Sequence, residues 1–341
     1  MYKYLFLFSA FIFLFCFCSR QEEAVSPVPV ILDTDVGNDI DDVLAMQMLF
    51  NYEKAGKIDL LGITISKCNP YAVEYVDGYS RFNGRHDLPI GYAYKGMNPD
   101  DGHYLRQTLD TVLQGSKVLF PQRSLTDSIP EGYKLIRKLL AGEKDRSVVL
   151  IAIGPETNLA RLLRSKADEY SPLDGKELVA RKVKRLSLMG GLFGDAFDFP
   201  EWNIVNDLEA ARITFEEWPT PLIASGWEVG HQLLYPHQSI LNDFPGNGKH
   251  PLCVSYGCYQ EMPYDRDTWD LTSVLQAVEP EKNYFRLSEK GTITIDSLGY
   301  SLFSPSPFGQ HQYLILEGKE NIASALNALV RQVTGKTNEK P

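Results

Sequence analysis

The densest group of chemically useful side chains lies near the start of the chain, where five carboxylates fall within ten residues. The segment reads Asp33-Thr34-Asp35-Val36-Gly37-Asn38-Asp39-Ile40-Asp41-Asp42. Carboxylates this close repel one another unless they are paired, and a hard divalent cation such as Ca²⁺ relieves the repulsion by taking several oxygen ligands. Gly37 allows a sharp turn, and Asp41 and Asp42 fall where a helix is expected to begin. The pattern therefore favours a cation site over a solvated acidic turn.

Two other interpretations fit this acidic segment less well. An EF-hand loop needs Glu at its twelfth position, and counting from Asp33 that position holds Leu44. A phosphatase of the haloacid dehalogenase kind also begins with Asp-x-Asp after a strand, with Asp33 as the nucleophile and a preference for Mg²⁺. That pattern expects Thr or Val where this chain has Gly37, and it lacks a matching downstream Lys and acidic pair. The phosphatase is the weaker alternative.

The elements that must position these side chains alternate along the sequence. Short apolar runs typical of buried strands occupy residues 29–32, 60–65, 89–92, 148–153 and 186–189. Helices are expected from about Asp42 and Thr157, over 207–217 and 320–333, and from a capping box at Ser128-Ile129-Pro130-Glu131 through Leu140. This alternation predicts a single α/β domain whose mostly parallel central β-sheet is flanked by helices, with a Rossmann-like core. Residues 95–126 are expected to form a loop over the site.

Ligands of such sheets bind outside the carboxyl ends of the strands, and that is where the other notable polar residues fall. Their motifs resemble, in order, those of the inosine-uridine-preferring nucleoside hydrolase family. That family opens with Asp-x-Asp-x-Gly-x-Asp-Asp, which this chain lengthens by two residues, Asp39 and Ile40. The later matches are Ile63-Thr64-Ile65-Ser66-Lys67-Cys68-Asn69, Ile153-Gly154-Pro155-Glu156-Thr157-Asn158 (Gly-Pro-Leu-Thr-Asn in the family), Glu201-Trp202-Asn203 and Trp269-Asp270. The resemblance covers about residues 28–333.

The resemblance implies hydrolysis of the C–N bond at the anomeric carbon of a ribonucleoside or related N-riboside, releasing free base and ribose. Ca²⁺ would be held by Asp35, Asp42, the backbone carbonyl of Ile153 and Asp270, and would bind the sugar hydroxyls and a water. Asp35 would take the proton from this water, and direct attack predicts inversion at the anomeric centre. The sugar hydroxyls would be held by Asp41, Asn69, Glu201 and Asn203.

One departure from the family concerns the leaving base. Several members place a His immediately before the late Asp, where this chain has Trp269. An indole cannot donate a proton in that way, although it can stack on a base as part of the substrate site or offer its N–H. His231 and His103 are the only histidines considered for that role, and Trp202, Phe193, Phe199 and Tyr264 are the aromatic residues considered as walls for the base. A calcium-containing sugar- or nucleoside-binding protein without catalysis is the second hypothesis.

Composition limits the partners. With 44 acidic against 34 basic residues the formal net charge is −10, which excludes binding of nucleic acid polymers through clustered Lys and Arg. A hydrophobic content of 44% in 341 residues is enough for a sizeable core. The cysteines beyond the N-terminal segment, Cys68, Cys253 and Cys258, do not have zinc-site spacing. A small-molecule nucleoside or N-riboside is the expected partner, and the resemblance implies a homo-oligomer.

The N-terminal segment predicts export. Lys3 precedes an apolar run over residues 5–18 that is too short to span a membrane comfortably, so residues 1–18 are expected to be a signal peptide. Cys16 and Cys18 stand where a bacterial lipoprotein would be cut and acylated, with Cys18 the expected anchor. Residues 19–27 are expected to be a linker and residues 28–335 the catalytic domain. The protein is expected in the periplasm or at the cell surface, with membrane contact only through this anchor.

Overall fold

The computed structural model describes residues 26–97, 102, 104–194, 198–246 and 248–336. The expected signal peptide, its cysteines and most of the expected linker lie outside these residues, and so does His103. No helix within the described part of the chain is both long and apolar enough to cross a membrane.

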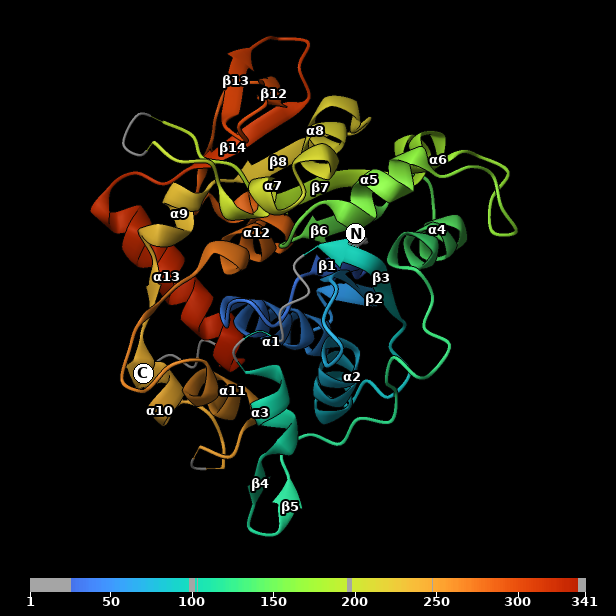
Figure 1. Cartoon of the computed structure of the whole chain (residues 1–341). Helices are drawn as coiled ribbons and strands as arrows, with labels where there is room; N and C mark the ends of the chain where they lie inside the picture. The colour runs from blue at the N-terminus through green and yellow to red at the C-terminus, as the bar shows by residue number, and fades with distance from the viewer. Residues whose placement is uncertain (1–25, 98–101, 103, 195–197, 247, 337–341) are drawn as a thin grey trace, which may run out of the picture.

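A twisted sheet forms the centre of the molecule (Figure 1). Its parallel strands, in spatial order, are β14 (His311–Ile315), β8 (Leu222–Ser225), β7 (Val183–Met189), β6 (Val148–Ala152), β1 (Val28–Thr34), β2 (Ile58–Lys67) and β3 (Ile90–Met97). Antiparallel strands extend the β14 edge: β11 (Arg286–Leu287), β12 (Gly291–Ile295) and β13 (Ser301–Pro305). The predicted α/β fold with a mostly parallel central sheet is confirmed.

Helices cover both faces of the sheet, which explains why the strands are apolar without interruption. Along β1, Val30 and Leu32 pack with one hydrophobic cluster while Ile31 packs with the other, because successive residues of a strand point to opposite faces. The first cluster includes residues of α1 (Asp41–Lys54), α2 (Ala72–Phe82), α12 (Trp269–Val278) and α13 (Lys319–Thr334). The second includes residues of α4 (Gly132–Gly142), α5 (Thr157–Arg164), α6 (Gly175–Lys182) and α8 (Leu208–Glu217).

Smaller elements surround the carboxyl ends of the strands and the lower part of the molecule in Figure 1. They are α3 (Leu105–Asp110), α7 (Trp202–Asn206), α9 (Trp227–His231), α10 (His237–Asn242), α11 (Pro251–Tyr259), a 3₁₀ turn at Pro280–Lys282, and the two-stranded pairs β4 (Val112–Leu113) with β5 (Ser116–Lys117) and β9 (Leu234–Tyr235) with β10 (Arg266–Asp267). Of these, α7, α9 and β10 carry residues of the site described below.

Two local predictions were wrong. The capping box at Ser128 does not open a helix, since α4 begins at Gly132 and its N-cap, Glu131, makes no side-chain capping hydrogen bond. The backbone before α4 runs beside β3 instead: the N–H of Tyr92 donates to the carbonyl of Pro130 at 3.0 Å, in keeping with the extended conformation that proline favours. The region expected as a loop, residues 95–126, contains α3 and the β4–β5 hairpin.

Candidate active site

A cavity of about 360 Å³ lies at the carboxyl ends of the central strands. Its lining consists of Asp35, Asn38, Asp39, Asp41, Asp42, Ile153, Met189, Glu201, Trp202, Asn203, Trp227, Arg266, Trp269 and Asp270. Of the nine residues predicted as site residues, only Asn69 is missing from this lining. These residues come from segments far apart in the sequence, and the parallel sheet brings them together because its strands all end at the same edge.

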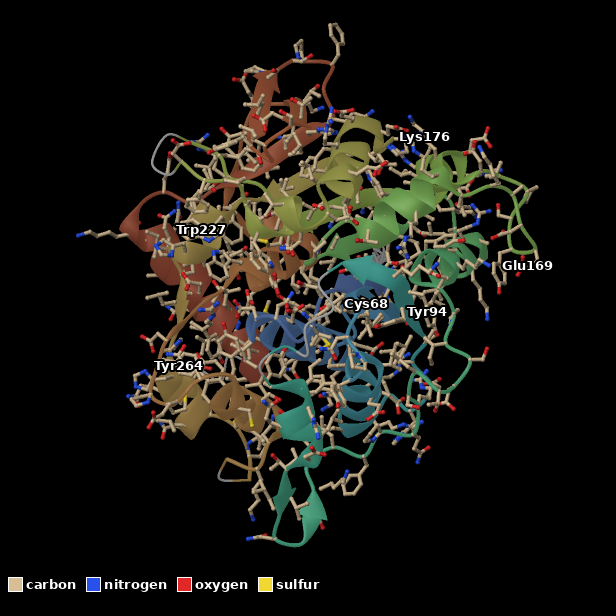
Figure 2. The ribbon with its side chains drawn as sticks, viewed as in Figure 1. Cys68, Tyr94, Glu169, Lys176, Trp227 and Tyr264 are labelled. Atoms are coloured by element: carbon tan, nitrogen blue, oxygen red, sulfur yellow. The ribbon has the colours of Figure 1, made fainter. Side chains whose placement is uncertain are left out.

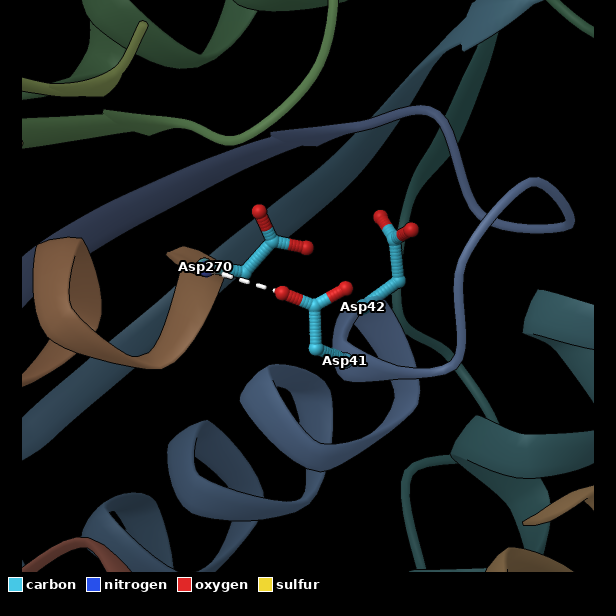
Figure 3. Close-up of side chains that lie close together, drawn as sticks. All are labelled: Asp41, Asp42 and Asp270. Atoms are coloured by element: carbon cyan, nitrogen blue, oxygen red, sulfur yellow. Dashed lines mark hydrogen bonds between the residues drawn. The ribbon is translucent and has the colours of Figure 1, made fainter. Parts of the chain in front are cut away.

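Three buried carboxylates of this lining lie close together (Figure 3). Asp41 and Asp42 stand in the first turn of α1, and Asp270 stands in the first turn of α12. Each offers one oxygen, and these oxygens all lie within 4.8 Å of one another. The hydroxyl of Thr34, the last residue of β1, donates to Asp42. Asp270 is thus a first-turn residue and not the helix N-cap, a position that Thr268 occupies.

These carboxylates suit a hard divalent cation. Burial raises the pKa of Asp41, Asp42 and Asp270, and the charge of neighbouring carboxylates raises each pKa further. Buried acidic groups repel one another when they are charged. A divalent cation that prefers oxygen ligands would neutralise their charge. The trio includes Asp41, which was predicted to hold the sugar, whereas Asp35, predicted as a ligand, lies outside it.

Asp35 lies on the same cavity, held in a defined orientation. Its side chain is 5% exposed, and its Oδ2 accepts a hydrogen bond from Nδ2 of Asn38 at 2.7 Å. Lys67 donates in turn to Asn38. Burial raises the pKa of Asp35 to about 6. The loop after β6 can pass beside this carboxylate because residue 154 is glycine: a Cβ there would lie 2.7 Å from the Cβ of Asp35.

Glu201 and Asn203 are placed by the start of α7. Glu201 is the N-cap: its Oε1 accepts from the N–H of Asn203 at 2.9 Å, and its Oε2 from that of Ile204 at 3.2 Å. Burial raises the pKa of Glu201 to about 7. Nδ2 of Asn203 donates to the carbonyl of Met189 at the end of β7, at 3.2 Å. The end of β7 therefore orients the amide of Asn203.

Two residues from the sequence interpretation lie away from the cavity lining. Asn69 is fully buried, and its Oδ1 accepts from the N–H of Tyr71 at 2.8 Å at the entry to α2. Asp33 is also fully buried, and its Oδ1 accepts from the Thr64 hydroxyl at 2.5 Å and from Nδ2 of Asn158 at 2.8 Å. An enclosed Asp33 cannot serve as a phosphatase nucleophile, which counts against that alternative.

The cavity lining also includes three tryptophan side chains. These are Trp202, Trp227 and Trp269, and the ring centroids of the last two lie 6.0 Å apart. Nε1 of Trp269 donates to the backbone carbonyl of Trp227 at 3.0 Å, so this N–H is already used within the protein. Among the other predicted walls, Phe199 packs edge-on against Trp227 at 5.1 Å.

The remaining two predicted walls lie elsewhere. Phe193 stacks on Tyr313 at 4.4 Å and Tyr264 stacks on Tyr256 at 4.4 Å. Figure 2 shows Trp227, the first residue of α9, and Tyr264 well apart from Trp227, near α11. Neither Phe193 nor Tyr264 lines the cavity of about 360 Å³.

Sequence reasoning missed Asn38, Met189, Trp227 and Arg266. Trp227 follows the run Leu222–Ser225, which forms β8, so the expectation that site residues lie just after a strand also applies to it. Arg266 had no comparable signal, since its hydrogen-bond partner, Asp39, is 227 positions away in the sequence. His231, the histidine considered for proton donation, stacks on Trp227 at 4.3 Å, and its Nδ1 lies 2.8 Å from Asp267.

Proteins of similar sequence include ribonucleoside hydrolases. A pyrimidine-specific ribonucleoside hydrolase, RihA, from Citrobacter koseri is 29% identical over 215 residues, which span 60% of this chain and 62% of that protein. The RihA of Enterobacter is also 29% identical, over 211 residues, 60% of this chain and 61% of its own length. The chain thus matches somewhat less than two thirds of the length of these relatives.

Solved structures show the same fold at lower identity. A purine-preferring ribonucleoside hydrolase from Gardnerella vaginalis superposes with a TM-score of 0.69 at 18% identity, over 90% of this chain and 98% of that one. A plant nucleoside hydrolase gives a TM-score of 0.66 at 20% identity, over 90% and 99%. The family model described as inosine-uridine preferring nucleoside hydrolase matches residues 30–298, and the chain therefore belongs to that family.

Proposed function

We propose that this protein hydrolyses the N-glycosidic bond of ribonucleosides or related N-ribosides, releasing free base and ribose, and that it does so with Ca²⁺. The observation that carries the proposal is one cavity in which the buried carboxylates Asp41, Asp42 and Asp270 lie together with Asp35. Family membership supports the reaction class. The names of the similar proteins refer to both pyrimidine and purine ribonucleosides, so they do not decide the base.

Different residues of the cavity would carry out different parts of the reaction. Asp41, Asp42 and Asp270, with Asp35 and the Ile153 carbonyl at the same cavity, would hold the cation. When bound, a hard divalent cation supplies positive charge that draws in vicinal hydroxyls and makes a nearby water more acidic.

Asp35 accepts the proton of the attacking water, and Asn38 keeps its carboxylate pointed into the cavity.

The sugar and base would occupy different parts of the cavity. Glu201 and Asn203 present oxygen atoms beside the carboxylates and would hold ribose hydroxyls, which fixes the anomeric carbon against the water. Trp202, Trp227 and Trp269 line the cavity with aromatic rings on which a planar base could stack. Attack by a water held at Asp35 predicts inversion at the anomeric carbon.

Ribose release from a panel of purine and pyrimidine ribonucleosides tests the proposal. The purified protein is assayed with Ca²⁺, with EDTA, with EDTA followed by Ca²⁺ or Mg²⁺, and as the Asp35→Asn variant. Asp145→Asn is the matched control, because Asp145 pairs with Arg181 and Lys182 on the surface. Release that EDTA and Asp35→Asn both abolish, and that Ca²⁺ restores, supports the proposal. Tight Ca²⁺ binding with no release from any nucleoside would favour the calcium-containing binding protein instead.

We also propose that the N-terminal signal segment exports the protein, is cleaved before Cys18, and leaves the protein anchored through an acylated Cys18. The support is the apolar run that precedes Cys18 in the sequence. Mass spectrometry of the protein from its native membrane, compared with a Cys18→Ser variant, tests this: a diacylglyceryl mass on Cys18 is expected, and an unmodified N-terminus would contradict it. Association into a homo-oligomer, expected from the family, is measured by light scattering of the same sample.

A further inference from the structure

An ion pair crosses the rim of the cavity. Nε of Arg266, in β10, donates to Oδ1 of Asp39 at 2.9 Å, and Nη2 donates to the other oxygen. Asp39 is one of the two residues by which the acidic segment exceeds the family pattern. Both side chains line the cavity and are about a fifth exposed, at 20% for Arg266 and 24% for Asp39. The inserted residue therefore fixes a cation at the site.

Aromatic rings fix the same guanidinium from other directions. Its central carbon lies 5.0 Å from the ring centre of Trp269 and 5.2 Å from that of Tyr259. Nη1, which makes neither of the bonds to Asp39, lies 4.0 Å from Oδ2 of Asp267, beyond hydrogen-bond distance. The guanidinium is thus held against Trp269 in the cavity lining, with N–H donors on Nη1 to offer a ligand.

Cleavage of the N-glycosidic bond needs a group that stabilises the leaving base. When the C1′–N bond breaks, its electron pair stays on the base, whose developing negative charge must be stabilised by a proton or a cation. The N–H of Trp269 is bonded to Trp227, and His231 is outside the cavity lining. Among the described residues that line the cavity, Arg266 is the one basic side chain.

We propose that Arg266 is the catalytic residue that stabilises the departing base, with Asp39 as the residue that positions it. The inference rests on the proposed function. Water forms the new bond to C1′, Asp35 takes its proton, and the electron pair of the broken bond moves onto the base. The guanidinium donates to a ring nitrogen or carbonyl oxygen of that base as the charge develops, and it keeps its own proton. The base is protonated by solvent after it leaves.

The alternative is that the ion pair only ties the loop before α1 to β10. The dependence of rate on the leaving group separates the two roles. Uracil and hypoxanthine, the bases of uridine and inosine, are poor leaving groups. In contrast, 4-nitrophenyl β-D-ribofuranoside releases a phenolate that needs little stabilisation. A residue that stabilises the leaving group matters for the nucleosides alone, and a residue that only holds the loop matters equally for both substrates.

The experiment compares kcat and KM of Arg266→Gln, Arg266→Lys and Asp39→Asn with the parent on these three substrates. We expect Arg266→Gln to lower kcat on the nucleosides by about 10²-fold or more, the cost typical of losing one donor to a developing charge, while kcat on the nitrophenyl riboside changes by less than about 3-fold. Arg266→Lys should recover part of the loss because it restores the charge. Asp39→Asn should lower nucleoside kcat less than Arg266→Gln does.

Arg164→Gln is the matched control, since Arg164 pairs with Glu217 at the surface. Thermal unfolding checks that each variant folds. If Arg266→Gln does not fold, the kinetics of Arg266→Lys on the same substrates are used instead. An equal fall on all three substrates, or no fall on nucleosides, overturns the assignment of Arg266. A parent protein that cleaves the nitrophenyl riboside but no nucleoside also overturns it. A parent inactive on every substrate overturns the proposed function itself.

Discussion

The backbone N–H of Asp270 donates to Oδ2 of Asp41 at 3.1 Å, although 229 positions separate the two residues. This bond joins the first turn of α12 to the first turn of α1 (Figure 3). Negative charge is favoured at both helix starts, so the dipoles of α1 and α12 partly offset the repulsion among the clustered carboxylates. A bound cation would relieve the repulsion that remains.

Ca²⁺ should stabilise the folded protein through Asp41, Asp42 and Asp270. Saturating Ca²⁺, at about 100 times its Kd, should raise the free energy of unfolding by about 2.7 kcal/mol, read as a rise in Tm. Asp270→Asn should lose most of that gain and be at least as stable as the parent in EDTA, because it removes one buried charge. A Ca²⁺-induced rise in Tm that survives this substitution would place the cation elsewhere, and Asp145→Asn should behave like the parent.

Asp35→Asn should abolish turnover while leaving the fold intact. Asn has the same shape and can keep a hydrogen bond to Asn38, but it cannot accept the proton of the attacking water. We expect kcat at saturating Ca²⁺ to fall by about 10³-fold with little change in the Tm of the Ca²⁺-free protein, since general base catalysis typically contributes 10²- to 10⁴-fold. A variant that keeps more than about a tenth of the parent's kcat would remove Asp35 from the role of base.

The sequence predicted the fold because its strands are apolar on both faces and alternate with helices. It also predicted the acidic half of the site, since Asp41, Asp42 and Asp270 each open a helix that follows a recognisable pattern. It could not predict which carboxylates lie closest together. Whether Asp35 or Asp41 joins the trio depends on how the loop from Asp35 to Ile40 folds, and no local pattern determines that loop.

Tertiary contacts explain the other differences. The loop before α1 is held by Tyr104, whose hydroxyl accepts from the N–H of Gly37 at 3.0 Å and donates to the carbonyl of Asp39 at 2.8 Å. Tyr104 lies in the region expected only as a loop. Arg266 was missed for the same reason: its partner Asp39 is 227 positions away, and sequence spacing does not reveal such a pair.

Glu228 should make stability fall as pH rises. It follows Trp227 in α9, and its Oε2 accepts from the N–H of Phe193 at 3.2 Å. Burial raises its pKa from 4.5 to about 7. A carboxyl whose pKa is higher in the folded state holds its proton more tightly there. Its contribution to the free energy of unfolding is therefore complete below pH 4.5 and is lost as pH rises toward 7.

Glu228→Gln keeps the acceptor and removes the titration. Between pH 5 and 8 the parent should lose about 2 kcal/mol relative to this variant, a shift of the order that such a pKa change implies. Chemical unfolding at several pH values measures the difference. Parallel pH profiles of parent and variant would show that Glu228 titrates normally in the folded protein.

Replacing Glu156 with leucine, the residue of the family pattern at this position, should stabilise the protein. Glu156 is fully buried at the start of α5, and neither of its carboxyl oxygens has a hydrogen-bond partner among the described residues. Burial raises its pKa well above 4.5, and the nearby charges of Glu201, Asp207 and Asp33 raise it further. Both effects make the charged form of this side chain costly inside the protein.

The gain from Glu156→Leu should therefore depend on pH. At pH 5 the variant should gain about 1 kcal/mol, from removing a buried polar group without a partner. The gain should be larger at pH 8, because a carboxyl whose pKa is raised in the folded protein loses its contribution to stability as pH rises above its ordinary pKa of 4.5. Glu156→Gln should abolish the pH dependence but keep the unpaired polar group. A leucine variant that is less stable than the parent at both pH values would mean that Glu156 has a stabilising partner, such as an ordered water.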